Sequence, residues 1–494
     1  MLKLVFLALV PSLLAFLSLT PKEDWPWFAE YSVNFCLGIL FCLSLVKSLS
    51  SFWLFSIAFA LCVQLNSVWL LDTIQKFGNF SFAVAVIIWA LYFILNLGSS
   101  SLFFLFYRCL KDLRFGVLAF PAACVVWENL PLQFFPWKLG YCFFSEKYIS
   151  PIVSILGTSG LTFLVSLAST ILLSKTRFKI PIFIGLLATT ALPLDVFQPQ
   201  KQLKGEVRAG LIQPNHSIDF KHNLQRLNEV ILDLNLLSEK VLNADLIIWP
   251  ESAINDLIFA GINHIDEDRY LRKLSFAKPT LLGMLTQDEF GQIYNSVIAL
   301  GNDGEIKGLY HKQILTPFGE YIPFKNYLPF LTVLNPIEDF SPGLKSEPLE
   351  VLGLRVGVLI CYEDLFPELS LRYAKQDADF ILVVANDLWF GLNYAPYLHD
   401  RFARFRARET LVPLVRVTNS GVSSVSDMYG ASEVKLKRNS KLAQATSIKI
   451  YSSGQSIFTK QGSEVLRYFV NISLLLIAMN LTFKTIKLGV RLKR

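Results

Sequence analysis

Cys361 is the side chain in this 494-residue sequence that is best placed to act as a nucleophile. It ends the apolar run 355–360, and the acidic residues Glu363 and Asp364 follow it in a turn. The other six cysteines all lie before residue 150, among long apolar runs. Cys361 is therefore the lone thiol of the polar half, either a buried small side chain or a reactive group. A free thiol titrates near pH ~8.5, so a reactive cysteine needs a base or a nearby cation.

Two further motifs supply a base and a cation. Glu251 follows the apolar run 246–249 in Trp-Pro-Glu, and Lys312 follows the run 306–311. Glu251 can accept the thiol proton, while Lys312 can favour the thiolate and stabilise an oxyanion with the backbone N–H after Cys361. Glu320, in Pro-Phe-Gly-Glu-Tyr, can orient Lys312 or the acceptor. Each residue alone is more often an ordinary core or surface side chain, but their coincidence at strand ends indicates a catalytic set.

The elements that must position these residues lie in a segment of mixed polarity, 198–465. Strands are predicted at 207–213, 246–249, 280–285, 294–300, 306–311, 355–360, 380–385, 414–418, 423–426 and 447–451. Helices are predicted at 222–241, 266–276, 366–376 and 396–410. Nearly continuous apolar strands such as 380–385 indicate sheets covered on both faces, hence an α/β layered domain. The basic stretch 404–409 is either an exposed helix face or a set of arginines paired with carboxylates inside the fold.

The rest of the chain has the composition of membrane helices. Apolar runs near 2–20, 31–48, 51–71, 79–106, 115–130, 149–174 and 180–197 approach the ~20 residues that a spanning helix needs. The expected organisation is a transmembrane helical domain of about seven spans at 1–197 and an α/β domain at 205–460. A last span at 467–483 and a basic tail at 484–494 follow.

Lysine and arginine are concentrated in alternate loops and in the tail, which orients the spans by the positive-inside rule. With the N-terminus inside, seven spans put residue 198 outside, and the last span returns the C-terminus to the cytoplasm. The net charge of +7 then reflects topology and gives no case for nucleic acid. The α/β domain is expected outside the cytoplasm, where an unpaired cysteine is more often catalytic than structural.

The three motifs, with Tyr294-Asn295-Ser296 and the segment 386–391, resemble the nitrilase superfamily. That resemblance implies a four-layer αββα sandwich over roughly 205–460. The apolar runs on both sides, and Phe-Pro-Trp-Lys-Leu-Gly-Tyr at 135–141, are similar to the apolipoprotein N-acyltransferase family. In that family a nitrilase-like domain is inserted before the last transmembrane helix.

The resemblance implies an acyltransferase that works by a ping-pong mechanism. Glu251, Lys312 and Cys361 match the family's catalytic triad, and Glu320, Tyr362 and Glu363 match further residues that the family needs. A phospholipid, for which phosphatidylethanolamine is expected, would donate a fatty acyl chain to Cys361 as a thioester. The α-amino group of an N-terminal diacylglyceryl-cysteine on an apolipoprotein would then accept it. No metal or cofactor is implied, and the location would be the bacterial inner membrane, with the α/β domain in the periplasm.

Lipid access is expected to involve apolar side chains beside the catalytic motifs. Leu328 and Phe330 lie in an apolar loop, and Trp389 and Phe390 form a second group. These residues are either mobile arms that dip into the bilayer or side chains packed on the fold. Phe220 is the nearest residue to a tryptophan that family members commonly carry, and its different spacing leaves the details of lipid contact open.

Three alternatives remain at this point. A membrane-tethered amidase would use the same triad with water as the acceptor. A catalytically silent scaffold or lipoprotein-binding protein would leave Cys361 inert. A transporter is the weakest reading, because Glu128 is the main ionisable exception within the apolar runs.

Overall fold

The structure is a computed structural model of the chain. It describes residues 27–49, 51–77, 80–111, 116–130, 135–217, 226–268, 271–273, 277–323, 339–344, 347–390 and 394–492, and the single residues 10, 11, 13, 14, 17, 133 and 325. The chain divides into two compact units. The helical unit comprises 1–75, 80–198 and 456–494, and the α/β unit comprises 199–455 with 76–79.

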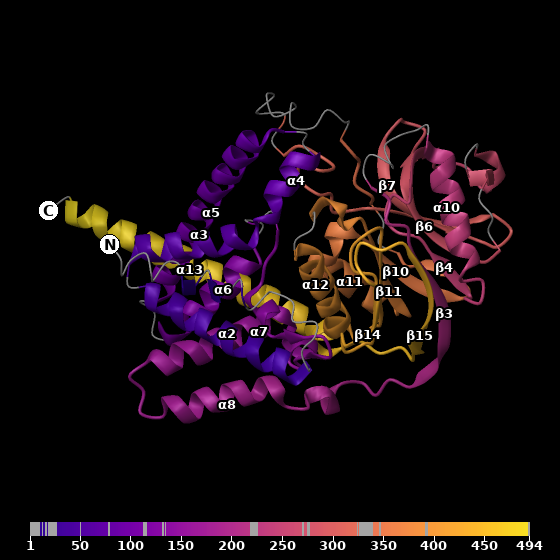
Figure 1. The fold of residues 1–494 in the computed structure, drawn as a ribbon. Coiled ribbons are helices and arrows are strands. Elements are labelled where there is room, and N and C mark those ends of the chain that lie inside the picture. The colour runs from indigo at the N-terminus through magenta and orange to yellow at the C-terminus, as the bar shows by residue number, and fades with distance from the viewer. Residues whose placement is uncertain are drawn as a thin grey trace. The chain divides into compact units, whose positions relative to one another are not determined.

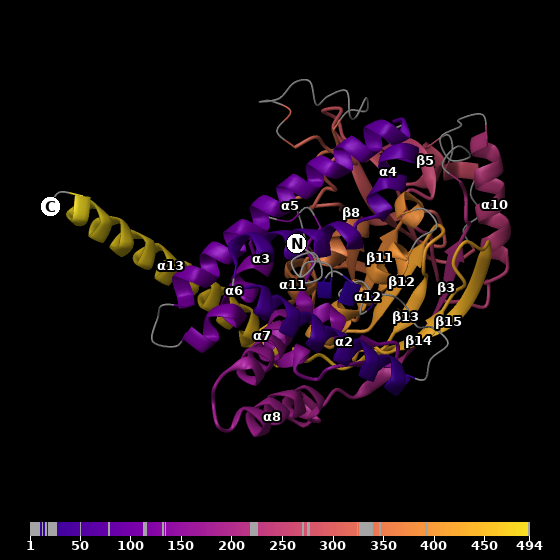
Figure 2. The same cartoon turned by 60° about the vertical axis from the view of Figure 1, so that its left-hand side comes forward.

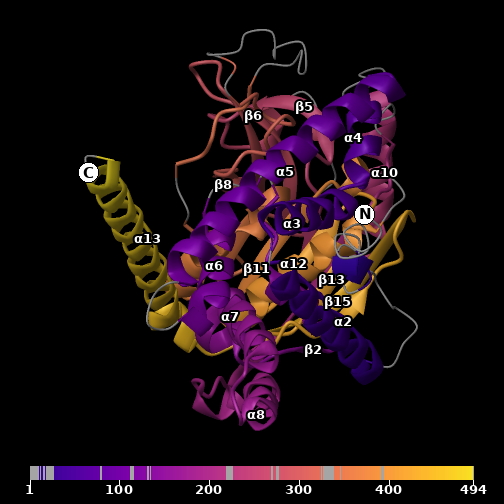
Figure 3. The same cartoon turned by 90° about the vertical axis from the view of Figure 1, so that its left-hand side faces the viewer.

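The helical unit is built from apolar helices. They are α2 (Trp27–Ser48), α3 (Phe52–Asn66), α4 (Trp69–Phe77), α5 (Phe82–Lys111), α6 (Ala119–Glu128), α7 (Val153–Leu173), α8 (Lys179–Ala191) and α13 (Ser463–Leu492). The short α6 packs between α5 and α7 (Figure 3). Within α7 the backbone is kinked at Gly157, which has a φ of 70°. A β-carbon at that position would collide with the ring of Phe458, so glycine is required there.

Among the described residues, three helices are long and apolar enough to cross a membrane: Phe82–Lys111, Val153–Leu173 and Phe458–Thr482. A fourth span is possible if the pair α3 and α4, bent by 57°, counts as one. The chain is thus a multi-pass membrane protein. Shorter apolar helices occur at Cys36–Lys47, Gly116–Glu128 and Lys179–Ala191. The predicted span at 2–20 lies almost wholly outside the described residues, so a total of about eight spans stays a prediction.

The α/β unit contains two sheets in its described part. One runs β15 (Leu442–Tyr451), β3 (Leu203–Gln213), β4 (Leu246–Ile248), β6 (Thr280–Gln287), β7 (Ile293–Leu300) and β8 (Ile306–His311), with β5 (Ile254–Phe259) beside β6. The other runs β14 (Ser432–Lys435), β13 (Ser424–Ser426), β12 (Leu414–Thr418), β11 (Phe380–Ala385), β10 (Leu354–Ile360) and β9 (Leu349–Val351). Strands β3 and β15, which are far apart in the chain, pair antiparallel along their whole lengths and form one edge of the first sheet (Figure 2).

Alternate side chains along the strands form two cores, which explains the layering. On β4, Leu246 and Ile248 pack toward the second sheet, whereas Ile247, and Trp249 just after the strand, pack toward helix α10 (Leu227–Glu239). Helices α11 (Pro367–Lys375) and α12 (Ala395–Thr410) cover the outer face of the second sheet (Figure 1). The resulting order of layers is helix, sheet, sheet, helix, as predicted for a nitrilase-like sandwich.

The predicted strands all form, and several differ only at their ends. The strands β5, β9 and β14 were not predicted, because they are short or carry charged residues that break the apolar pattern. The helix predicted at 266–276 is wrong where the structure describes that segment. Two short 3-10 turns, Ile265–Glu267 and Leu271–Lys273, are found there instead. The charged side chains of this segment leave few apolar positions to bury, so a continuous helix gains little from packing.

The directions of the strands determine at which sheet edge the candidate catalytic residues lie. Strands β3, β4 and β6 are parallel, and β8 is antiparallel to β7, which is itself antiparallel to β6. Strands β4 and β8 therefore end at the same edge of the first sheet. In the second sheet β10, β11 and β12 are parallel and also share one edge at their carboxyl ends. Glu251, Lys312, Cys361 and Asp387 all follow these strand ends.

Candidate active site

Cys361 stands at the junction between β10 and a 3-10 turn, Cys361–Leu365. Its φ is 51°, in the left-handed region that side chains other than glycine rarely adopt. Such a backbone costs on the order of 1–3 kcal/mol and persists only where surrounding contacts enforce it. The side chain is half-buried against the core between the sheets. The thiol is thus presented by a constrained turn rather than packed away as a core residue.

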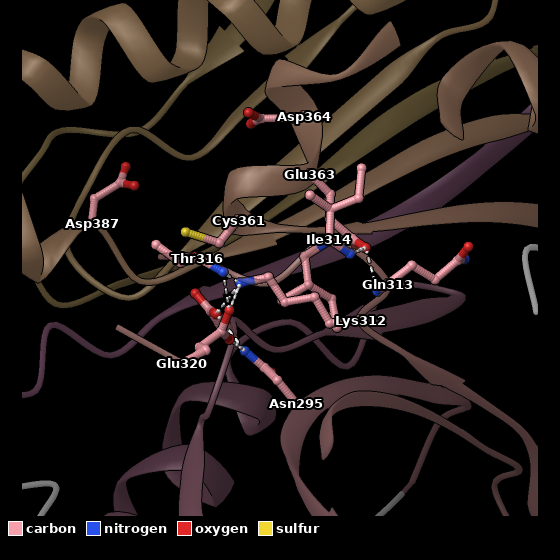
Figure 4. Close-up of polar contacts among 12 residues, drawn as sticks. Asn295, Lys312, Gln313, Ile314, Thr316, Glu320, Cys361, Glu363, Asp364 and Asp387 are labelled. Atoms are coloured by element: carbon pink, nitrogen blue, oxygen red, sulfur yellow. Dashed lines mark hydrogen bonds and ion pairs between the residues drawn. The ribbon is translucent and has the colours of Figure 1, made fainter. Parts of the chain in front are cut away.

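The carboxylate of Glu363 is one of the groups that enforce this turn. Its oxygens accept hydrogen bonds from the backbone N–H of Ile360 at 2.7 Å and from Gln313 and Ile314 at 2.6 and 3.1 Å. The Tyr310 hydroxyl donates at 2.9 Å as well. Burial raises the pKa of Glu363 to about 7, although these backbone donors lower it. Glu363 therefore ties the Cys361 turn to the loop after β8 that carries Lys312, as Figure 4 shows.

Lys312 is almost fully buried, with 1% of its side chain exposed. Its ammonium lies 2.7 Å from a carboxylate oxygen of Glu320, 3.8 Å from one of Glu251 and 3.2 Å from the Thr316 hydroxyl. Burial lowers the pKa of Lys312, but Glu320 and Glu251 outweigh it and raise the pKa above its ordinary value. The ammonium stays charged and points toward both Glu320 and the Cys361 turn (Figure 4).

Asn295 connects the two glutamates of the site. Its Nδ2 donates to Oε1 of Glu251 and to Oε1 of Glu320, at 2.7 Å in both cases. Its backbone oxygen accepts from the N–H of Lys312 at 2.8 Å. The sequence marked Asn295 only as part of a resemblance motif, with no role attached. A polar residue within the apolar strand β7 was the signal that could have found it.

A glycine in the middle of β6 allows Glu251 to lie close against this strand. A β-carbon at Gly283 would lie 2.5 Å from the Pro250 oxygen and 2.7 Å from the Glu251 α-carbon. Only glycine allows the Trp-Pro-Glu segment to approach so closely. The buried Glu251 carboxylate thereby reaches Lys312 and Asn295 from the end of β4.

These surroundings set the protonation state of the nucleophile. Burial raises the pKa of the Cys361 thiol, and the carboxylates of Glu251, Asp387 and Asp364 raise it further. Lys312 lowers this pKa, as the sequence predicted, but it does not outweigh the other groups. The resting side chain is therefore a thiol, and its proton must be taken by a base as the sulfur attacks.

Behind Cys361 lies a buried ionic cluster that the sequence did not predict. His399, on α12, contacts Asp364 through Nε2 and Asp387 through Nδ1, each at 2.9 Å. Arg416, on β12, contacts the same carboxylates at 2.7 and 3.0 Å. Burial and Arg416 lower the pKa of His399, but the two aspartates outweigh them and raise it to about 9. All four side chains are buried, so His399 is part of an internal ionic cluster.

The arginines of α12 are buried as well. Arg404 donates to the Gly430 oxygen at 2.9 and 2.8 Å, and Arg406 pairs with Glu409 at 3.0 Å. Of the two readings of 404–409, the internal pairing is confirmed and the exposed face is wrong.

The predicted lipid-access residues are only partly described. Phe220, Leu328 and Phe330 lie outside the described residues. Trp389 and Phe390 belong to a 3-10 turn, Asp387–Phe390, and are half-buried. The Phe390 ring stands edge-on to His399, with centroids 5.6 Å apart. A role in lipid access stays a prediction for these residues.

Comparison with known proteins places this site in a family. The carbon-nitrogen hydrolase family model matches residues 208–447. Among relatives, an apolipoprotein N-acyltransferase of Geobacter metallireducens is 33% identical over 60% of this chain and 60% of its own length. That of Rickettsia prowazekii is 31% identical over 64% of this chain and 67% of its own. That of Shewanella oneidensis is 30% identical over 70% of each. This chain belongs to the apolipoprotein N-acyltransferase family.

The matched segment covers about three-fifths of the Geobacter acyltransferase and about two-thirds of the Rickettsia acyltransferase. Among solved structures, Nit3 of Saccharomyces cerevisiae, from the nitrilase superfamily, covers 53% of this chain and 95% of its own. Its sequence identity is 18% and its TM-score is 0.37. The family assignment rests on the sequence relatives.

Proposed function

We propose that this protein transfers a fatty acyl chain from a phospholipid to the α-amino group of an N-terminal diacylglyceryl-cysteine. The observation that carries the proposal is the constrained, half-buried Cys361 thiol beside the Lys312 ammonium and the Glu251 carboxylate. Membership of the apolipoprotein N-acyltransferase family supplies the substrate class. Phosphatidylethanolamine is the proposed donor.

In the first half-reaction the Cys361 sulfur attacks the ester carbonyl of the phospholipid. Glu251 accepts the thiol proton, which is needed because the thiol is protonated at rest. The buried ammonium of Lys312, with the backbone N–H that follows Cys361, stabilises the oxyanion. The carbon–oxygen bond then breaks, the lysophospholipid alkoxide takes the proton from Glu251, and a thioester remains on Cys361.

In the second half-reaction the α-amine attacks the thioester carbonyl. Glu251 accepts the amine proton, the carbon–sulfur bond breaks, and the thiolate is reprotonated to regenerate the thiol. Glu320 holds Lys312 at 2.7 Å in both steps. Glu363 and the adjacent Tyr362 act as positioning residues for the turn, since Glu363 binds its backbone and Tyr362 packs on Phe366.

The proposed location is the bacterial inner membrane, with the α/β unit in the periplasm and the C-terminus in the cytoplasm. The distribution of lysine and arginine among the loops supports this orientation. A domain at 205–460 would then meet both lipid substrates at the outer leaflet. Trp389 and Phe390, with Phe220, Leu328 and Phe330, are proposed to guide the acyl chain.

The test is mass spectrometry of the purified full-length protein after incubation with phosphatidylethanolamine vesicles. We expect a mass gain of one acyl chain that hydroxylamine removes and that Cys361→Ser abolishes. Adding a diacylglyceryl-cysteinyl lipopeptide should discharge the thioester and yield N-acylated lipopeptide. Cys142→Ser, which removes a buried cysteine of the helical unit, is the matched control and should leave the adduct in place.

Two results would contradict the proposal in different ways. Release of free fatty acid without N-acylated lipopeptide would indicate a hydrolase that uses water as the acceptor. A protein that is folded but gains no acyl mass, and whose Cys361 does not react with thiol reagents, would indicate a silent scaffold.

A further inference from the structure

The imidazole of His399 connects two turns that stand at the ends of neighbouring strands. Through Nε2 it contacts Asp364 at 2.9 Å and donates to the backbone oxygen of Cys361 at 3.3 Å. Through Nδ1 it contacts Asp387 at 2.9 Å, at the start of the turn that carries Trp389 and Phe390. One buried ring therefore binds both the nucleophile turn and the aromatic turn.

The contact with the Cys361 oxygen lies at a residue whose backbone conformation is energetically unfavourable. Cys361 has its φ at 51°, so the orientation of its peptide groups depends on outside contacts. Glu363 fixes the preceding side of the turn through the Ile360 N–H. His399 binds the following carbonyl. The first contact holds the peptide group that precedes Ile360, and the second holds the peptide group that follows Cys361, so the two contacts bracket the nucleophile.

We propose that His399 is a positioning residue for Cys361, which holds the left-handed turn so that the thiol faces Glu251 and Lys312. It acts through the Cys361 carbonyl and through Asp364, and it does not touch the reacting atoms. The inference rests on the proposed role of Cys361 as the acylated nucleophile. A misplacement of the thiol by about 1 Å would slow acylation by about 100-fold.

The remaining contacts explain why the fold should survive loss of this imidazole. Arg416 binds both Asp364 and Asp387, at 2.7 and 3.0 Å, and lies 2.8 Å from Nδ1 of His399. Without His399 the two carboxylates keep a buried cationic partner. The Cys361 carbonyl, in contrast, would lose the imidazole N–H as a donor. Removal should therefore affect the nucleophile turn more than the packing of the sheet.

Two substitutions of His399 distinguish the role of Nε2 from the role of Nδ1. The amide nitrogen of glutamine can take the place of Nε2 and so keep the contact with the nucleophile turn. Asparagine is shorter and can replace only Nδ1, on the side of Asp387. We expect His399→Asn to slow alkylation of Cys361 by iodoacetamide, and thioester formation, by 10- to 100-fold. We expect His399→Gln to remain within about threefold of the unmodified protein in both assays.

His264 provides a matched control. Its Nε2 also binds a backbone oxygen, that of Asp303 at 2.8 Å, in a loop on another part of the α/β unit. His264→Asn and His264→Gln should leave the alkylation rate of Cys361 unchanged. Alkylation is followed by mass spectrometry of the Cys361 peptide in the full-length protein, so it does not depend on which substrate the enzyme uses.

The alkylation rates of the two His399 variants, compared with their melting temperatures, decide whether the proposal holds. Faster alkylation in His399→Gln than in His399→Asn, at similar melting temperatures, supports the proposal. Equal losses in both variants, in step with their melting temperatures, would mean that His399 only stabilises the fold and would overturn it. Unchanged alkylation in both would overturn it as well. Absence of lipoprotein acylation with this alkylation pattern intact would count against the proposed function and not against the positioning role.

Discussion

Replacing Glu320 by glutamine should disable the enzyme by moving Lys312 rather than by unfolding the protein. The Lys312 ammonium has two carboxylate neighbours, Glu320 at 2.7 Å and Glu251 at 3.8 Å. Glutamine keeps the size of the side chain but removes the nearer charge. We expect the ammonium to move toward Glu251, where it would stabilise the carboxylate and weaken it as a base.

The distances indicate the size of the effect. Loss of one partner of a buried ion pair costs about 3–5 kcal/mol when the remaining charge has no other partner. Glu251 stays within ion-pair distance, so the cost to stability should fall near or below about 3 kcal/mol. The rate of thioester formation should fall by about 100-fold or more, because base and cation would neutralise each other. The pKa of Lys312 should also decrease, since burial then opposes only one carboxylate.

The assay measures single-turnover thioester formation as a function of pH, together with the melting temperature in detergent. Glu305→Gln is the matched control, because Glu305 pairs with Lys307 on the exposed surface and should leave both measurements unchanged. The reasoning would be refuted by a Glu320→Gln variant that forms the thioester at the normal rate with an unchanged pH profile.

Three further predictions follow from the same contacts. Asn295→Asp should slow thioester formation by about 100-fold in single-turnover assays, because it removes the donors to Glu251 and Glu320 and adds a third negative charge. Gly421→Ala should lower stability by about 1–3 kcal/mol in thermal melts, since a β-carbon there would lie 1.9 Å from Asp387, whereas Gly205→Ala should have no effect. His399, whose pKa is raised to about 9 between Asp364, Asp387 and Arg416, should contribute stability that is complete below pH ~6.5 and is lost as the pH rises through about 9. That loss should approach about 3 kcal/mol, and His399→Gln should flatten the alkaline part of the stability curve.

The strands around the candidate site were predictable because their signals are local. The runs at 306–311, 380–385 and 414–418 became β8, β11 and β12 with the same bounds. Each is a continuous apolar or β-branched segment, and such a segment favours a buried strand wherever it lies in the chain. The parallel order of the strands then brings their ends together, so the motifs that follow them could be expected to converge.

The contacts that set the reactivity of the site were not predictable in this way. Glu363 accepts from backbone groups 50 and 49 residues away, and Arg416 reaches Asp364 across 52 residues. In a sequence, a buried charge looks the same as an exposed one, which is why 404–409 remained ambiguous and the ionic cluster around His399 was not predicted. Only the packing of α12 on the second sheet shows which charges are paired.

The sequence by itself determined the nitrilase-like layering and the multi-pass helical unit, and it singled out the candidates for nucleophile, base and cation. These properties depend on apolar periodicity and on short motifs, which are written in neighbouring residues. The tertiary structure decided how the groups act on one another. It placed the Cys361 backbone at a positive φ, set the half-buried thiol beside three carboxylates so that it stays protonated, and bound its carbonyl to His399. Burial and distance govern electrostatic interactions, and both arise only when remote segments pack together.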